Sequence, residues 1–215
     1  FPVVPDDLAA ISRYYQLEEQ GSDQIIGYSA RVIAVTPKDE FRYGYRFWIE
    51  EGSRMMLKSD LTGADGKAIE QVVFTSLDID TDIPASELQP SLSGDGYTWH
   101  RQTEIKTAED PAQGSPGWVV RQLPAGFVLS DFRRRRLHEQ GNDAEHMVFT
   151  DGMATVSVYI ERTMPETDAF TGPSNMGAMN AYGTVVDGYQ VTVVGEVPPA
   201  TVKMIATSVN RQASS

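Results

Sequence analysis

The segment 41–50 constrains the fold of this chain more than any other feature of its sequence. Large apolar side chains alternate with other residues along it, and a period of two is that of a β-strand and not of a helix. The opposite face of the strand carries two arginines, but it also holds Trp48. One face therefore needs a complete apolar cover and the other only a partial one. The apolar face consists of Phe41, Tyr43, Tyr45, Phe47 and Ile49.

The residues on both sides of this segment predict further strands in the same sheet. Apolar runs of strand length alternate there with clusters of Gly, Pro, Ser and Asp, which are typical of turns. The apolar runs are 25–35, 55–61 and 69–79, and the turn clusters are 21–23, 37–39, 51–53 and 63–66. We therefore interpret residues 11–79 as an antiparallel β-meander.

Between residues 93 and 117 the hydrophobic periodicity stops. The stretches 93–96 and 109–117 consist mainly of Gly, Pro, Ser and acidic residues, which is the composition of turns and linkers. The expected organisation is a first domain over residues 1–92, a linker over 93–117 and a small second domain over 118–215.

A second β-rich pattern begins at Trp118. The dipeptide Asp187-Gly188 lies between two alternating runs, which is a strong signal for a tight hairpin. The predicted strands are 127–137, 146–150, 154–160, 182–186 and 189–194, with a loop at 171–180.

A helix is predicted to follow the last of these strands. Pro198 and Pro199 suit a helix start, because proline lacks the N–H that a first turn leaves without a partner. A four-stranded sheet needs an apolar cover on one face, and this helix has the length and polarity to supply it. Its apolar face consists of Val202, Ile205, Ala206 and Val209.

Composition and motifs argue against several classes of function. The net charge of −12 disfavours nucleic acid as the main partner, and the absence of Cys excludes disulfides and thiol chemistry. The chain has no nucleophile elbow, no H-E-x-x-H zinc motif, no dinucleotide-binding motif and no Walker motif. No stretch has the length of a membrane span, and residues 1–5 lack the features of a signal peptide. We therefore expect no enzymatic activity, no cofactor and no metal.

Arg133, Arg134, Arg135 and Arg136 form a basic run in this acidic chain. In a strand they alternate between two faces, so all four cannot line one patch. One interpretation is a charged edge strand that discourages pairing with another sheet edge. The other is recognition of an anion, either a lipid phosphate or acidic residues of a partner chain. The sequence leaves both interpretations open.

The apolar stripe from Phe41 to Ile49 also allows two interpretations. It is either part of a protein core or the wall of a lipid cavity, since apolar concave sheets are a known ligand-binding geometry.

Several motifs along the chain point to one family. In the C-terminal half they are Trp118 and the segments 123–127 (LPAGF), 149–152 (FTDG), 176–183 (MGAMNAYG) and 191–199 (VTVVGEVPP). Upstream they are Tyr14-Tyr15, the segment 43–48, and the stretch from Asp60-Leu61 through Glu70-Gln71. These residues resemble the RseB/MucB family of periplasmic sigma-factor regulatory proteins, and the resemblance covers nearly the whole chain.

The resemblance implies an α+β fold that is mostly β. The first domain would be similar to the second half of a lipoprotein-carrier-like domain, a curved antiparallel sheet wrapped on helices with a hydrophobic cavity. A small antiparallel sheet with a C-terminal helix would follow it. Because members of the family carry the first half of the large domain before the position of Phe1, the resemblance implies an N-terminally truncated chain.

The resemblance also implies a function in the periplasm. Its members bind the periplasmic domain of an anti-sigma factor of the MucA/RseA kind and shield it from the protease that starts envelope-stress signalling. Lipid or lipopolysaccharide then releases the regulator. The alternative is a periplasmic lipid or lipoprotein carrier, and a homodimer is also kept among the expected assemblies.

Overall fold

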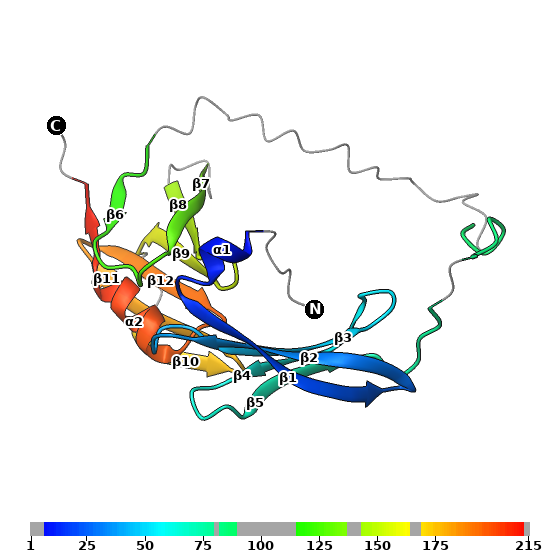
Figure 1. The fold of residues 1–215 in the computed structure, drawn as a ribbon. Coiled ribbons are helices and arrows are strands. Elements are labelled where there is room, and N and C mark those ends of the chain that lie inside the picture. Colours follow the sequence, from blue (N-terminus) through cyan, green and yellow to red (C-terminus); the bar gives the residue numbers. More distant parts are fainter. Residues whose placement is uncertain (1–6, 80–81, 90–114, 137–142, 164–168, 213–215) are drawn as a thin grey trace.

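The computed structural model describes residues 7–79, 82–89, 115–136, 143–163 and 169–212. Strands dominate it, and they form two large antiparallel sheets that meet near the short helices α1 (Leu8–Ile11) and α2 (Pro199–Thr207) (Figure 1). The expected fold class, mostly β with antiparallel sheets and a C-terminal helix, is confirmed. Within the described residues, no helix is both long and apolar enough to cross a membrane.

The first sheet is the predicted meander. Its five strands follow one another in space in the order of the sequence, and each is antiparallel to the next. The alternation of segment 41–50 is realised in the central strand of this sheet, with Tyr45 and Phe47 buried. The strands are β1 (Tyr15–Ile25), β2 (Tyr28–Pro37), β3 (Gly44–Glu50), β4 (Met56–Thr62) and β5 (Ala68–Val73).

Two local predictions for this sheet were wrong. The cluster 21–23 is not a turn but a β-bulge inside β1, where Gly21 has φ +97°. The chain reverses instead at Ile26 and Gly27, both of which have positive φ. In addition, β3 begins at Gly44 rather than at Phe41, because the preceding residues fold back as a loop. A bulge and a turn use the same small and polar residues, so composition alone did not separate them.

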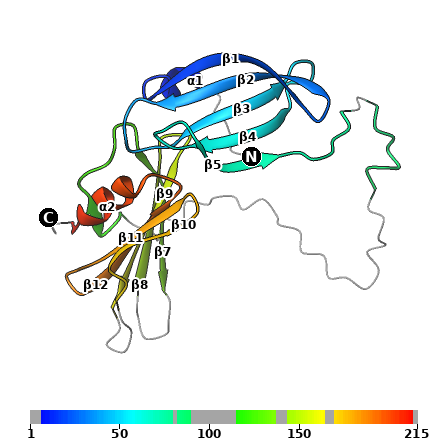
Figure 2. The same ribbon diagram turned by 90° about the horizontal axis from the view of Figure 1, so that it is seen from below.

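The second sheet has six strands in the order β10-β11-β12-β9-β8-β7 (Figure 2). The predicted hairpin at Asp187-Gly188 is confirmed, since both residues have positive φ (51° and 77°), as the favoured two-residue hairpin turn requires. The strands are β7 (Val128–Arg136), β8 (Asp143–Thr150), β9 (Thr155–Arg162), β10 (Gly172–Met176), β11 (Met179–Val186) and β12 (Tyr189–Gly195).

The helix α2 covers this sheet as predicted. Val202, Ile205 and Ala206 are buried in its core, whereas Val209 belongs to β13 (Val209–Arg211), which pairs with β6 (Trp118–Val120). The region 171–180 was predicted as a loop, but it forms β10 and a turn into β11. The sheet therefore has six strands, and β10 is the one that was not predicted.

The cores of the two sheets touch each other. The largest cluster lies between the second sheet and α2, and the cluster under the first sheet contains Ala178, which comes from the turn between β10 and β11. The predicted linker, residues 93–117, falls mostly outside the described residues. Its bounds, and those of the two domains, stay predictions.

Candidate functional site at the junction of the two sheets

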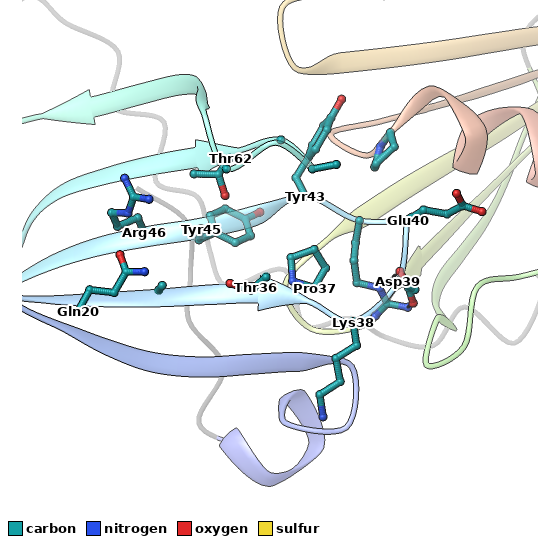
Figure 3. Close-up of a pocket in the computed structure, with 16 residues that line it drawn as sticks. Gln20, Thr36, Pro37, Lys38, Asp39, Glu40, Tyr43, Tyr45, Arg46 and Thr62 are labelled. Atoms are coloured by element: carbon teal, nitrogen blue, oxygen red, sulfur yellow. Dashed lines mark hydrogen bonds and ion pairs between the residues drawn. The ribbon is translucent and has the colours of Figure 1, made fainter.

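The two large sheets meet at the loop 38–43, which connects β2 to β3 (Figure 3). Asp39 folds this loop back, because its Oδ1 accepts hydrogen bonds from the backbone N–H of Phe41 at 3.0 Å and from Nε of Arg42 at 3.1 Å. This local turn ends the strand alternation before Gly44. It leaves Arg42 free of the sheet and in contact with the second half of the chain.

The Arg42 side chain is completely buried (0% exposed) at this junction. Its Nη1 lies 2.6 Å from Oδ2 of Asp151, and its Nη2 donates to the backbone carbonyl of Ala125 at 2.6 Å. The same Nη2 lies 3.1 Å from Oδ2 of Asp39. A charge that is removed from water costs several kcal/mol unless it is paired and hydrogen-bonded, and here the guanidinium meets both conditions.

Asp151 is the partner carboxylate, and its side chain is also 0% exposed. Its Oδ1 accepts hydrogen bonds from the backbone N–H of Met153 at 2.9 Å and of Ala154 at 2.8 Å, which shapes the turn between β8 and β9. Its Oδ2 accepts a hydrogen bond from the Tyr15 hydroxyl at 3.0 Å in addition to that from Arg42. One carboxylate thus connects a turn of the second sheet to two side chains of the first half.

Aromatic rings surround the buried guanidinium. The Cζ atom of Arg42 lies 5.0 Å from the ring centroid of Tyr14, 5.5 Å from that of Tyr15 and 5.2 Å from that of Phe127. Such faces attract a cation, and the attraction is stronger where water is excluded. Tyr14 and Tyr15 come from the first half and Phe127 from the second, so the cation is shared between them.

Two further hydrogen bonds cross the junction. Nδ2 of the buried Asn180 donates to the Tyr43 hydroxyl at 3.0 Å and to the Val197 carbonyl at 2.9 Å. The hydroxyl of Thr201, on α2, donates to the Phe41 carbonyl at 2.7 Å. Loop 38–43 is therefore held at three successive residues, 41, 42 and 43, by elements that lie more than 80 residues away.

Burial also shifts the pKa values of tyrosines at the junction. Burial first, and then the neighbouring Asp151 carboxylate, raises the pKa of Tyr15 well above its ordinary value. Burial likewise raises the pKa of Tyr45 to about 12, from an ordinary value of 10.0. Both hydroxyls therefore stay protonated at neutral pH.

We expect the protein to lose stability at alkaline pH, and Tyr45→Phe to reduce that loss. The raised pKa of Tyr45 stabilises the fold fully below pH 10.0, and this contribution is lost as the pH rises from there to about 12. Melting temperatures recorded across that range should fall less steeply for the Phe variant than for the parent chain. Tyr159→Phe, at an exposed tyrosine, is the control and should leave the slope unchanged. Equal slopes for Tyr45→Phe and the parent chain would contradict this assignment.

A cavity of about 520 Å³ adjoins the junction (Figure 3). Arg42 and Asp39 lie at its end near the second sheet, together with Pro198, and Arg46, Thr36 and Thr62 line the part over the first sheet. Its volume is in the range of pockets that bind small molecules. The junction and the cavity therefore form one continuous candidate site.

The polar groups of the junction pair with one another. The junction groups Arg42, Asp151, Tyr15 and Asn180 already satisfy one another, and none is left as an accessible nucleophile or base. Among the described residues, no group of three or more His, Cys, Asp or Glu side chains could hold a metal ion.

The structure places the basic run on β7, which is an edge strand of the second sheet. Arg133 forms an exposed ion pair with Asp131 (2.8 Å), and Arg134 pairs with the largely buried Glu145 (2.7 Å). The side chains of Arg135 and Arg136 lie outside the described part of the chain. A role of this run in binding an anion stays a prediction.

The predicted apolar stripe divides between two places. Tyr45 and Phe47 stack with their ring centroids 5.5 Å apart inside the core of the first sheet, and Ile49 packs against the same core. Tyr43 and Phe41 belong to the loop that makes the junction. Tyr43 and Tyr45 also line the cavity, and a lipid-facing role for the stripe stays a prediction.

Sequence reasoning did not identify Arg42 and Asp151, the pair at the centre of the junction. A signal was present for each: Arg42 lies on the mixed face of a strongly alternating segment, and Asp151 opens a predicted turn within the FTDG motif. The two residues are 109 positions apart, however, and only the packing of the two sheets joins them.

Two family descriptions match the chain. Residues 1–92 match the MucB/RseB N-terminal domain, and residues 112–210 match the MucB/RseB C-terminal domain.

Curated relatives match the chain over almost its whole length. The sigma factor AlgU regulatory protein MucB of Pseudomonas aeruginosa is 29% identical over 220 residues, which covers 100% of this chain and 66% of that protein. The sigma-E factor regulatory protein RseB of Escherichia coli K12 is 28% identical over 212 residues, which covers 94% of this chain and 61% of that protein. The chain thus spans less than two thirds of the length of these relatives.

Solved structures agree with these matches. The crystal structure of MucB in complex with MucA(peri) superimposes with a TM-score of 0.76 at 27% identity and covers 97% of this chain and 72% of that chain. The complex structure of MucA/MucB from Pseudomonas aeruginosa gives a TM-score of 0.77 at 27% identity, with 100% of this chain and 71% of that chain covered.

Proposed function

The chain belongs to the MucB/RseB family, and from this membership we propose that it regulates a sigma factor by binding the periplasmic segment of an anti-sigma factor. The observation that carries the proposal is the likeness to MucB as solved together with MucA(peri), which extends over 97% of this chain. The likeness includes both sheets and not one of them alone. This supports a partner surface to which both halves contribute.

The junction supports this proposal in physical terms. Binding a partner costs less conformational entropy when the surfaces that contact it are already held in a fixed orientation. Arg42, Asp151 and Asn180 fix the two sheets relative to each other with buried contacts. We further propose that the bound protein shields the segment from proteolysis in the periplasm, and that lipid or lipopolysaccharide releases it.

The test of the partner is direct binding and protection. The periplasmic segment of the anti-sigma factor from the same organism is titrated into the purified protein by calorimetry, and the segment is then exposed to a protease with and without the protein. Saturable binding and slower cleavage are expected. Absence of binding by a folded sample would contradict the proposal. Sedimentation of the same sample decides whether a homodimer forms.

Release by lipid is tested in the same assay. By thermodynamic linkage, a ligand that weakens partner binding must itself bind more weakly when the partner is present, by the same factor. Adding lipopolysaccharide to the complex should therefore restore cleavage of the segment.

The second candidate function, a periplasmic lipid or lipoprotein carrier, is favoured by the cavity of about 520 Å³. It predicts lipid that co-purifies with the protein, and no protein partner.

We expect the basic run to contribute charge to one of these ligands. Replacing Arg133 to Arg136 with Ala should weaken binding of the acidic ligand, because Arg forms charge-assisted hydrogen bonds with carboxylate and phosphate. Calorimetry with the anti-sigma segment and with lipopolysaccharide measures both affinities.

The control for this variant removes the same charge elsewhere. Four exposed arginines away from β7 are replaced with Ala in one chain, namely Arg13, Arg31, Arg121 and Arg162. A melting curve establishes that each variant is folded, which matters because Arg134 pairs with Glu145. If the β7 variant keeps both affinities, or loses no more than the control does, the basic run has no such role.

A further inference from the structure

The strand β5 is the outermost strand of the first sheet on the side of the second sheet (Figure 2). Within the described residues no strand pairs with its outer edge, and all six of its residues are exposed. Two of them, Val72 and Val73, are apolar and β-branched. An edge of this kind presents unpaired main-chain donors and acceptors beside apolar side chains, so it can act as a template for a further strand.

The other three edge strands of the two large sheets carry features that discourage such pairing. A bulge follows Glu19 in β1 and Leu129 in β7, and β7 also carries the basic run. The strand β10 has five residues, of which Pro173 has no N–H to donate. In β5 the register is irregular only at Ile69, and the stretch 70–73 pairs regularly with β4 and contains neither proline nor a basic residue. The edge of β5 is therefore the least protected of the four.

The hydrogen bonding between β5 and β4 shows which main-chain groups point outward. The N–H of Phe74 donates to the Leu57 carbonyl at 3.1 Å, so the main-chain groups of residue 74 point to β4. Main-chain groups alternate in direction along an antiparallel strand. The groups of Val72 therefore point the same way, whereas those of Gln71 and Val73 point away from β4. Two N–H and two C=O groups are thus directed at the outer edge.

The charges near this edge favour a basic occupant. Glu70 lies on the same face of β5 as Val72, and Glu196, which follows β12, lies near it. Partial burial raises the pKa of Glu196, and the Glu70 carboxylate raises it further. Neither carboxylate forms an ion pair within the part of the chain that the structure describes. A second copy of the chain would bring the same carboxylates and a net charge of −12 to this edge, so charge complementarity favours a positively charged segment instead.

We propose that β5 pairs with an extended segment of a partner chain in which basic side chains alternate with apolar ones. The main chain of the segment exchanges hydrogen bonds with Gln71 and Val73. Every second side chain of the segment lies on the face of Glu70 and Glu196, which suits Lys or Arg, and the others lie beside Val73, which suits apolar residues. In such pairing the main chain supplies affinity and the alternating side chains supply specificity. That the segment belongs to an anti-sigma factor rests on the proposed function, whereas the addition of a strand does not.

A peptide of alternating lysine and valine, blocked at both ends, tests the edge without any partner chain. Calorimetry with the purified protein should show binding, and the same peptide with glutamate in place of lysine should bind more weakly by roughly tenfold or more. Hydrogen exchange followed by NMR locates the contact. The amides of Gln71 and Val73 should exchange more slowly in the complex by roughly tenfold or more, and those of β1 should not change.

Two variants at one position separate the main chain from the side chain. Val73→Pro removes an outward N–H but no hydrogen bond to β4, and it should weaken the lysine peptide by roughly tenfold. Val73→Thr is the matched control, because it keeps both the N–H and the β-branched shape, and it should leave the affinity unchanged. Glu70→Gln should weaken the lysine peptide by roughly 2- to 5-fold, the range of an exposed ion pair.

Two methylated peptides test the same contact if Val73→Pro does not fold. One carries methyl groups on its valine nitrogens and the other on its lysine nitrogens. Only one of these two sets faces β5, since main-chain groups alternate in direction, so one peptide should lose binding and the other should keep it.

Several results would overturn the proposal. They are absence of binding by the lysine peptide, equal affinity of the two methylated peptides, equal affinity of the lysine and glutamate peptides, and undiminished binding by a folded Val73→Pro variant. A dimer that sedimentation detects and that Val73→Pro dissociates would also overturn it, because a second copy would then occupy the edge. None of these results decides whether the anti-sigma segment binds, which calorimetry with that segment measures separately.

Discussion

Replacing Arg42 with Met is expected to lower the free energy of unfolding by about 3–5 kcal/mol. Methionine keeps an unbranched side chain of similar length, but it leaves the Asp151 carboxylate buried without its counter-ion. The remaining partners of Asp151, the Tyr15 hydroxyl and two backbone N–H groups, do not carry a positive charge. Urea denaturation measures the change. The control is Arg31→Met, at an exposed arginine whose ion-pair distances of 3.9 and 4.0 Å predict an effect of about 0–1 kcal/mol.

A double variant separates the ion pair from the packing around it. Asp151→Asn keeps an oxygen for the N–H groups of Met153 and Ala154 but removes the charge. Combined with Arg42→Met it leaves neither residue of the pair as an unpaired buried charge. The double variant should therefore lose less free energy of unfolding than the two single variants lose together, by about 0.5–3 kcal/mol. Fully additive costs would contradict the assignment of Arg42 and Asp151 as one unit.

The same variants report on how the two sheets are coupled. Each sheet has its own buried cluster, with Trp48 in a cluster of the first and Trp118 in the core of the second. If the buried contacts at loop 38–43 couple the two sheets, the parent chain should unfold in a single transition. The Arg42→Met variant should then unfold in two separate transitions, one for each sheet. Tryptophan fluorescence of chains that keep only Trp48 or only Trp118 follows each sheet separately.

The sequence predicted well those elements that have one buried and one exposed face. Alternation identified β3, the Asp187-Gly188 dipeptide identified a hairpin, and 3.6-residue spacing identified α2. In each case the signal is local, because the periodicity follows from the geometry of the element itself.

The elements that sequence reasoning missed lack such a local signal. The strand β10 has the sequence GPSNM and is exposed along most of its length, so no alternation marks it. The bulge at Gly21 has the composition of a turn. At the candidate site, Arg42 was placed correctly on the mixed face of its segment, but its role depends on Ala125 and Asp151, which only tertiary packing brings near.

Gly126 is the second position where a small change should have a large effect. Its φ is +90°, and a Cβ added there would overlap the ring of Tyr14. The neighbouring Ala125 carbonyl accepts a hydrogen bond from Arg42, so a shift of this turn also disturbs the buried cation. Gly126→Ala is expected to lower the free energy of unfolding by about 2–5 kcal/mol, from backbone strain together with overpacking.

Gly172→Ala is the matched control for this prediction. Gly172 has nearly the same φ, +91°, but a Cβ added there has no heavy atom within 4 Å. Its cost should therefore be that of backbone strain alone, about 1–3 kcal/mol. The difference between the two variants in urea denaturation measures the contact with Tyr14. Combining Gly126→Ala with Tyr14→Ala should remove part of that difference, because the ring no longer occupies the space. If Gly126→Ala costs no more than Gly172→Ala, the turn at Gly126 does not hold the two sheets together.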